Sequence, residues 1–471
     1  MEDADAQEPQ VPQDSASPQR APVFGNPLTD ISELQKGSQS SNDWKFGNPG
    51  FGSPLDKPEA LSIRLTYPET REEIRSVRTV KIGYQVFPVE LLRDSCACVR
   101  CVDPHSTQKH FQTTDIPDNI SVKRLLEKPN GNIEVKWWND IPGFPEDHVS
   151  VFPPDNFDKK SPTFLRQRSP SGYSLWNAQG IRRRFEYIDY HEYMTTDVGL
   201  HRALLRLTFD GLLLLRGVPE SEESVARIAN RIGVIRNTFY GRTWDVKSVP
   251  DAKNVAYTSR YLGLHMDLLY MANPPGFQFL HCLKNTASGG ASIFSDAVAA
   301  AADLPAGYQE RLKNTLLSYQ YLNAGEHYYY EHPVIECSPG SENTPSKIQH
   351  VNYSPPFQAP FAARSENIGQ VPAFLEAFRA FSQAVESPHR VLEYKLQEGE
   401  CVMFDNRRVL HGRKAFDAVG GERWYKGTYV DTDVVKSRTR VLDAKHPEYK
   451  EHFWSRIGDT KLVFPPVRYH G

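Results

Sequence analysis

The sequence has few cysteines, no long apolar segment and no excess of positive charge. Six cysteines in 471 residues are too few for a disulfide scaffold, so we expect a reducing compartment. No apolar run approaches the roughly 20 residues that a membrane-spanning helix needs, and we expect no membrane partner. Lys and Arg total 55 against 58 Asp and Glu, which gives a net charge of −3. This balance disfavours a nucleic-acid partner.

The N-terminal segment lacks both targeting patterns and apolar periodicity. Residues 1–58 consist mainly of Gln, Ser, Pro, Gly, Asn and Asp, a composition that cannot offset the entropy of ordering, and we predict a disordered tail. Arg20 is the only basic residue among the first 35, unlike the Arg-rich pattern of a transit peptide. There is no apolar signal-peptide core either, so we expect a cytoplasmic enzyme.

The rest of the chain indicates two folded domains. Alternating apolar and polar residues predict strands at 79–84 and 133–138, in a small β domain over residues 59–165. A segment rich in Pro, Ser and Lys, from Phe152 to about Pro170, marks the boundary. In residues 166–471 we expect helices at 221–235 and 371–385 and short strands at 277–280, 292–294, 401–404 and 424–430. The predicted fold class is α+β, mainly β: a double-stranded β-helix, or jelly-roll, core with helical insertions.

The most informative motif pairs a histidine with a carboxylate. In an extended strand His265 and Asp267 would project from the same face, so both could reach one metal ion. The candidate third ligand is His411, which follows an apolar strand and a polar turn. Two His and one carboxylate on one face of an octahedron leave three positions open, as non-haem Fe(II) oxygenases require. Taken alone, His-x-Asp also occurs by chance in many proteins of this length.

An arginine that binds the cosubstrate would complete such a site. Arg423 lies twelve residues after His411 and could return along a neighbouring strand to face the metal. Its guanidinium would bind the distal carboxylate of 2-oxoglutarate in a bidentate manner. The alternative is a surface ion pair with Glu422 or Asp431.

With these residues in place, the sequence resembles the γ-butyrobetaine dioxygenase and trimethyllysine dioxygenase family of iron- and 2-oxoglutarate-dependent hydroxylases. The resemblance covers about residues 61–442, and its most specific blocks are 254–258, 274–282, 411–414 and 429–438. It implies that His265, Asp267 and His411 hold Fe(II). It also implies that Arg423 binds the cosubstrate 2-oxoglutarate, with Leu280 and Ser292 beside it.

The same resemblance implies an aromatic cage for a trimethylammonium group, a cation that ring quadrupoles stabilise well. The cage positions fall on Tyr240, Trp244, Tyr257 and Tyr429, and Asn254 matches a polar contact at the carboxylate end of the substrate. The alternative is that these rings only pack in the core.

The expected reaction is hydroxylation of γ-butyrobetaine to L-carnitine, the last step of carnitine biosynthesis. It would consume O2 and 2-oxoglutarate and release succinate and carbon dioxide, with ascorbate as a further reductant. Ser354 stands where the family pattern has asparagine, and Met266 replaces a small polar residue. These departures keep trimethyllysine or another betaine open as the substrate. A zinc-stabilised binding protein that has lost catalysis is the alternative from a different class.

A second metal site is predicted near the N-terminus. Cys96, Cys98 and Cys101 lie too close together for ordinary disulfide pairing and suit tetrahedral Zn(II). The resemblance supplies the fourth ligand as a histidine after a Trp-rich strand, which His148 matches, while His105 and His110 are alternatives. A closed site of this kind would be structural; otherwise the cysteines are three free buried thiols. The resemblance also implies a homodimer to which this domain contributes.

Overall fold

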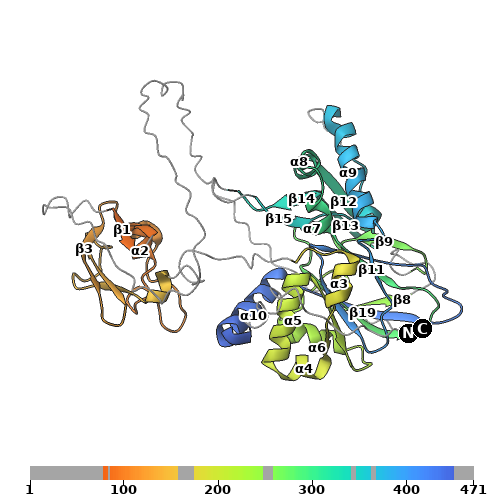
Figure 1. Ribbon diagram of the computed structural model, residues 1–471, viewed down its shortest axis with the longest axis horizontal. Helices are drawn as coiled ribbons and strands as arrows, with labels where there is room; N and C mark the ends of the chain where they lie inside the picture. The colour runs from red at the N-terminus through yellow and green to blue at the C-terminus, as the bar shows by residue number, and fades with distance from the viewer. Residues whose placement is uncertain are drawn as a thin grey trace, which may run out of the picture. The chain divides into compact units, whose positions relative to one another are not determined.

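The computed structural model (Figure 1) describes residues 78–82, 85–157, 174–247, 258–340, 346–361 and 368–449. The chain forms two compact units, Met1–Phe164 and Leu165–Gly471. The predicted tail over residues 1–58 lies outside the described residues, as do Asn254 and Tyr257. Among the described residues, no helix has the length and apolar character needed to cross a membrane.

The N-terminal unit is a small β structure with its own core. Its strands follow from the alternation of apolar and polar residues: in β4, buried residues alternate with half-buried ones. A three-stranded antiparallel sheet, β3-β4-β5, lies beside a two-stranded sheet, β1-β2, and buried side chains such as Phe87, Val135 and Phe152 join them. The elements are β1 Thr79–Ile82, β2 Gln85–Pro88, α2 Val89–Asp94, η1 Thr113–Asp115, β3 Ser121–Glu127, β4 Ile133–Trp138, β5 Val149–Phe152 and η2 Pro154–Phe157.

The C-terminal unit is built on two sheets that face each other. The six-stranded sheet has the order β6-β7-β17-β10-β19-β8, and the four-stranded sheet has the order β16-β11-β18-β9. Buried side chains from both sheets, including Leu280, Phe294 and Val402, form one cluster between them. The strands are β6 Tyr187–Asp189, β7 Leu212–Arg216, β8 Trp244–Lys247, β9 Leu262–His265, β10 Phe277–Asn285, β11 Ser292–Asp296, β16 Leu392–Tyr394, β17 Cys401–Asp405, β18 Val409–Arg413 and β19 Arg423–Val430.

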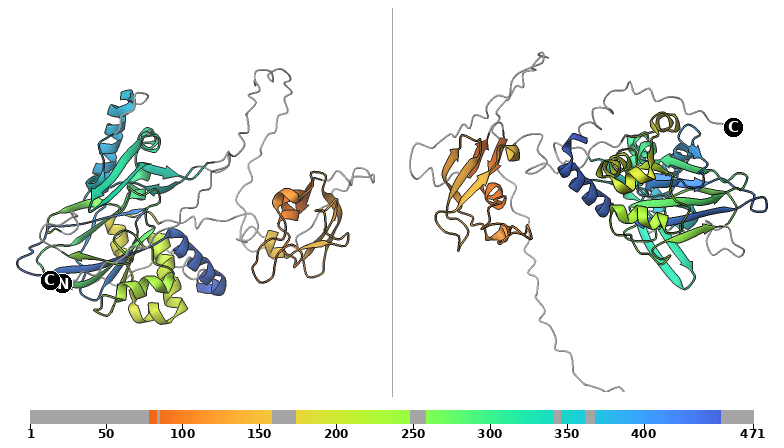
Figure 2. Two further views of the ribbon diagram at one scale, coloured as in Figure 1. Left: turned by 180° about the vertical axis from the view of Figure 1, so that it is seen from behind. Right: turned by 90° about the horizontal axis from the view of Figure 1, so that it is seen from below.

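This arrangement confirms the predicted jelly-roll core with helical insertions. Helices α4, α5, α6 and α10 gather on one side of the strands (Figures 1 and 2), where α5 and α6 pack on the outer face of the six-stranded sheet through Leu204, Ile228 and Phe279. The bounds are α3 Ala178–Arg184, α4 Tyr190–Thr195, α5 Asp197–Asp210, α6 Ser224–Ile232 and α10 Thr432–Lys445.

A second group of elements is inserted between β11 and β16. Its helix α9 begins with a proline in the first turn and buries Phe374, Ala377, Phe381 and Val385 at helical spacing. The group contains α7 Ala297–Ala302, α8 Ala306–Asn314, β12 Leu316–Asn323, β13 Glu326–Pro333, β14 Ile335–Cys337, β15 Ile348–Val351, η4 Pro355–Phe357, η5 Ile368–Gln370 and α9 Val371–Glu386.

A buried histidine on β10 should make stability depend on pH. His281 is fully buried, and neither ring nitrogen has a hydrogen-bond partner among the described residues. Burial lowers the pKa of His281 from 6.5 to about 4, against the attraction of Glu220. The unfolded chain therefore binds a proton between pH 6.5 and 4 that the folded chain does not bind, so stability is lost as pH falls through this range.

We expect His281→Leu to remove this acid-induced loss of folding stability, which amounts to roughly 3 kcal/mol in the free energy of unfolding. Urea unfolding at pH 4.5 and 7.5 measures the effect, with His327→Gln as the control because His327 is exposed. Equal pH dependence of stability in the His281→Leu variant and the unmodified protein would contradict the prediction.

Candidate active site

Three candidate metal ligands meet on the inner face of the four-stranded sheet. His265 and His411 are directly opposite each other where β9 pairs with β18, and their ring centroids are 4.2 Å apart. Oδ1 of Asp267 lies 3.4 Å from Nε2 of His265 and 3.8 Å from Nε2 of His411. The structure thus brings together the three residues that the sequence singled out, with ligand atoms within 4.8 Å of one another.

The local geometry differs from the predicted one at Asp267. Strand β9 ends at His265, so the two side chains do not converge through simple strand alternation. Leu268 adopts a φ of +61°. The side chain of Asn406 forms hydrogen bonds with both the N–H and the carbonyl of Asp267. Its Oδ1 accepts from the Asp267 N–H at 2.8 Å, and its Nδ2 donates to the Asp267 carbonyl at 3.1 Å.

Sequence reasoning missed this role of Asn406. The residue is fully buried and also donates to the carbonyl of Pro275 at 3.1 Å, so it fixes the turn that carries the carboxylate. The available signal was an asparagine directly after the apolar strand β17, where a short amide side chain often bonds to the backbone.

Burial and neighbouring groups set the protonation states. Burial alone would raise the pKa of Asp267, but its interactions with His411, His265 and Tyr429 hold the pKa of that carboxyl well below its usual range. Burial, together with repulsion from His265, lowers the pKa of His411 to about 3. An ionised carboxylate beside neutral imidazole is the state in which these groups bind a metal, so the residues present fit Fe(II).

The predicted cosubstrate arginine lies on the sheet that faces the candidate metal ligands. Arg423 begins β19, which belongs to the six-stranded sheet, whereas His411 lies on β18 of the four-stranded sheet. The prediction of a return along a neighbouring strand was wrong, because the chain crosses from one sheet to the other between these residues. Arg423 still faces the interior, with 5% exposure, since alternate residues of β19 point toward the facing sheet.

The surroundings of Arg423 suit a bound carboxylate. Its guanidinium carbon lies 3.8 Å from the centroid of the Tyr425 ring, and its Nε has no hydrogen-bond partner among the described residues. Burial, followed by repulsion from Arg423, lowers the pKa of Arg413 to about 10, which indicates that two cationic groups lie close together. Leu280 is buried on β10, and Ser292 is buried on β11 and bonds to Tyr425. The buried Arg423 guanidinium, whose Nε has no partner among the described residues, fits one carboxylate of the cosubstrate.

Three of the predicted cage rings lie together beside Asp267. The rings of Trp244 and Tyr429 stack with centroids 4.1 Å apart, and Tyr240 lies 6.3 Å from Trp244. The Tyr429 hydroxyl donates to Oδ2 of Asp267 at 2.6 Å. At Gly427, opposite Trp244 on β19, a Cβ atom would approach the indole to 2.6 Å, so only glycine leaves room for this stack.

Further aromatic rings continue from Tyr240, and sequence reasoning missed them. Their centroids lie 4.1–6.4 Å apart, and they come from the β12–β13 hairpin, η4 and the loops that precede β8 and follow β9: Phe239, Tyr270, Tyr321, Tyr328 and Phe357. Phe239 directly precedes Tyr240, but no local motif signals the rings of the hairpin and η4, because these elements are distant from Tyr240 in sequence. Together the rings make the wall behind Tyr240 apolar.

The two departures from the family pattern are both buried. Met266 is fully buried, and its N–H donates to the Tyr353 carbonyl at 2.9 Å. Ser354 is 1% exposed, and its hydroxyl has no partner among the described residues. Asn352, two positions earlier, donates to Glu336 and to the carbonyl of Pro333.

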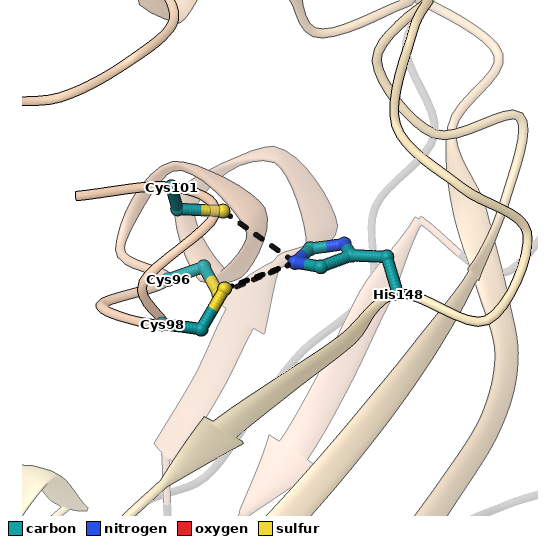
Figure 3. A group of neighbouring side chains, drawn as sticks. All are labelled: Cys96, Cys98, Cys101 and His148. Atoms are coloured by element: carbon teal, nitrogen blue, oxygen red, sulfur yellow. Dashed lines mark hydrogen bonds between the residues drawn. The ribbon is translucent and has the colours of Figure 1, made fainter. Parts of the chain in front are cut away.

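The N-terminal unit brings the predicted cysteine cluster together with His148. Nε2 of His148 lies 3.7 Å from Sγ of Cys96 and 3.4 Å from Sγ of both Cys98 and Cys101. Figure 3 shows the three thiols pointing at one nitrogen of the imidazole. The alternatives His105 and His110 are exposed and do not belong to this group.

Interactions around the cluster orient its ligands. Nδ1 of His148 bonds to Asp140 at 2.6 Å, and Arg93 bridges Asp140 and Cys101. Burial opposes protonation of the imidazole, but the bond to Asp140 and those to the cysteines raise the pKa of His148 to about 10, so an ion bound here would displace the imidazole proton. The hydrogen bond from Cys101 outweighs burial and lowers the pKa of Cys96 to about 3. A thiolate and a histidine fixed by a carboxylate are typical of structural zinc sites.

Two facing sheets that hold two histidines and a carboxylate between them define the class of non-haem iron oxygenases. The comparisons with known proteins agree with this class. Residues 173–429 match the family described as "Taurine catabolism dioxygenase TauD, TfdA family", and residues 75–142 match "Gamma-butyrobetaine hydroxylase-like, N-terminal".

Named relatives cover most of the chain. Dioxygenase str8 of Strobilurus tenacellus is 39% identical over 76% of this chain and 85% of its own length. Gamma-butyrobetaine dioxygenase of Pseudomonas sp. (strain AK-1) is 32% identical over 74% of this chain and 89% of its own length. Mitochondrial trimethyllysine dioxygenase of Gallus gallus is 28% identical over 82% of this chain and 89% of its own length.

The chain therefore belongs to the TauD, TfdA family, within the group that contains the γ-butyrobetaine and trimethyllysine dioxygenases. It is a 2-oxoglutarate-dependent dioxygenase, as the sequence predicted, and Fe(II) is the metal of this class.

Proposed function

We propose that this enzyme hydroxylates a trimethylammonium compound and that γ-butyrobetaine, converted to L-carnitine, is its substrate. The observation that carries the proposal is the position of the Trp244–Tyr429 stack, whose phenol bonds to Asp267. A quaternary ammonium held by these rings would lie directly beside the candidate metal ligands. The names of two relatives, a γ-butyrobetaine dioxygenase and a trimethyllysine dioxygenase, support the substrate class.

Each residue has a proposed task. His265, Asp267 and His411 hold Fe(II), and Arg423 orients 2-oxoglutarate, with Leu280 and Ser292 against it. When bound, the iron and 2-oxoglutarate supply the oxidant for a C–H bond. The rings of Tyr240, Trp244, Tyr257 and Tyr429 fix which carbon is presented and exclude water, and Asn254 contacts the anionic end.

The N-terminal unit has a proposed structural role. We assign a zinc domain to residues 59–165, with Zn(II) held by Cys96, Cys98, Cys101 and His148, and a dioxygenase domain to residues 166–471. A four-ligand site leaves no open position, so the metal would stabilise a small core rather than act on substrate. We also propose that the enzyme is a cytoplasmic homodimer and uses ascorbate as a reductant.

A second candidate substrate is trimethyllysine or another betaine. Ser354 and Met266 favour another betaine, because both replace side chains of the family pattern near the site. The apolar wall of rings behind Tyr240 also offers contacts to a larger cation.

Succinate formation tests the proposal. The Fe(II)-loaded enzyme is incubated with 2-oxoglutarate and O2 and with γ-butyrobetaine, trimethyllysine or no second substrate. The masses of the products are measured by mass spectrometry. We expect a product heavier by one oxygen atom from γ-butyrobetaine. Turnover of neither compound would overturn the proposed substrate and direct the search to other betaines.

Trp244→Ala should weaken binding of γ-butyrobetaine about 30-fold, because a desolvated cation loses a contact worth about 2 kcal/mol. The KM for 2-oxoglutarate should change less than about threefold. Trp138→Ala, on β4 of the other unit, is the control. Equal losses for both substrates would count against the cage.

A further inference from the structure

The phenol of Tyr429 touches both the candidate cage and the candidate metal site. Tyr429 is 1% exposed on the inner face of β19, and its ring stacks on Trp244. Its hydroxyl donates to Oδ2 of Asp267 at 2.6 Å, a length typical of a hydrogen bond to an ionised carboxylate. The ring and the hydroxyl thus have separate partners.

This hydrogen bond distinguishes the two oxygens of the carboxylate. Oδ2 of Asp267 is engaged by Tyr429, whereas Oδ1 is the oxygen that lies 3.4 Å from Nε2 of His265 and 3.8 Å from Nε2 of His411. Asn406 fixes the backbone of Asp267 at the same time. A carboxylate restrained at its backbone and at one oxygen presents the other oxygen as a single donor atom.

We propose that Tyr429 is a positioning residue for the metal: its hydroxyl orients Asp267 so that Oδ1 alone binds the ion. The inference rests on the proposed iron site and deepens it. The ring of Tyr429 contributes to the cage, and the hydroxyl acts on the metal through Asp267. Partners that orient metal ligands typically contribute 10–100-fold to metal affinity.

Mn(II) binding to the full-length protein tests the proposal without turnover. Free Mn(II) is measured by electron paramagnetic resonance during titration of the unmodified protein and of Tyr429→Phe, which keeps the ring and removes the hydroxyl. We expect a 10–100-fold weaker Kd in Tyr429→Phe. Tyr240→Phe is the matched control, because its hydroxyl contacts that of Tyr270 at 3.4 Å; its Kd should stay within about threefold.

The visible spectrum of bound Co(II) provides a second measurement that a general loss of stability would not produce. We expect the Co(II) bands to shift in Tyr429→Phe, because the released Oδ2 can then approach the ion, and to stay unchanged in Tyr240→Phe. Thermal unfolding verifies that both variants are folded at the titration temperature.

The outcomes separate this inference from the function on which it rests. If the unmodified protein and Tyr429→Phe bind Mn(II) equally and give the same Co(II) spectrum, the positioning role is wrong and the proposed iron site stands. If Asp267→Ala binds Mn(II) as tightly as the unmodified protein, the proposed iron site itself is wrong, and the inference falls with it.

Discussion

Cys101→Ser is expected to release zinc and to unfold the N-terminal unit while the C-terminal unit stays folded. Structural zinc contributes about 10–16 kcal/mol in small zinc domains, which exceeds the stability that a unit of this size obtains from its core. Cys101 is also the cysteine that Arg93 contacts, at 3.3 Å. Its loss therefore removes a metal ligand and one partner of a fully buried guanidinium.

Metal analysis and proteolysis measure this effect. The zinc content should fall from about one ion per chain to near zero, and limited proteolysis should cleave within residues 85–157 while the dioxygenase unit resists. Cys337→Ser is the matched control, because Cys337 is a half-buried cysteine on β14 of the C-terminal unit. Unchanged zinc content in Cys101→Ser would show that the cluster does not hold the ion.

Arg423→Gln should nearly abolish binding of 2-oxoglutarate. Removing one partner of a buried, hydrogen-bonded charge pair costs about 2–5 kcal/mol, which corresponds to a Kd raised roughly 30-fold or more. We do not expect Arg413 to replace Arg423, because its Nη2 already donates to the carbonyls of Thr258 and Arg260.

Calorimetric titration of the Mn(II)-loaded enzyme with 2-oxoglutarate under anoxic conditions measures this loss. Arg216→Gln is the control, since Arg216 pairs with Glu400 at the end of β7 outside the site. Mn(II) affinity should be unaltered in both variants because neither arginine contacts a metal ligand. A Kd for 2-oxoglutarate within threefold of the unmodified enzyme would remove Arg423 from the proposed cosubstrate site.

The sequence by itself was sufficient where the signal is local. Alternation predicted strands that the structure contains, such as β1 and β4, short apolar runs predicted β10 and β17, and helical spacing predicted α6. The short motifs around His265 and Cys96 identified both groups of candidate ligands. The strand and helix predictions succeeded because side-chain direction repeats every two residues in a strand and about every 3.6 in a helix, so neighbours in sequence constrain each other.

The tertiary structure alone decided which distant residues meet. It selected His148 over His105 and His110, and it placed Arg423 on the sheet opposite that of His411. It also placed the Tyr429 hydroxyl on Asp267 and the Asn406 amide on the same residue's backbone. Contacts of this kind depend on how two sheets face each other and where the chain crosses between them. The contact between Tyr429 and Asp267 joins residues 162 positions apart, and no periodicity of one strand encodes it.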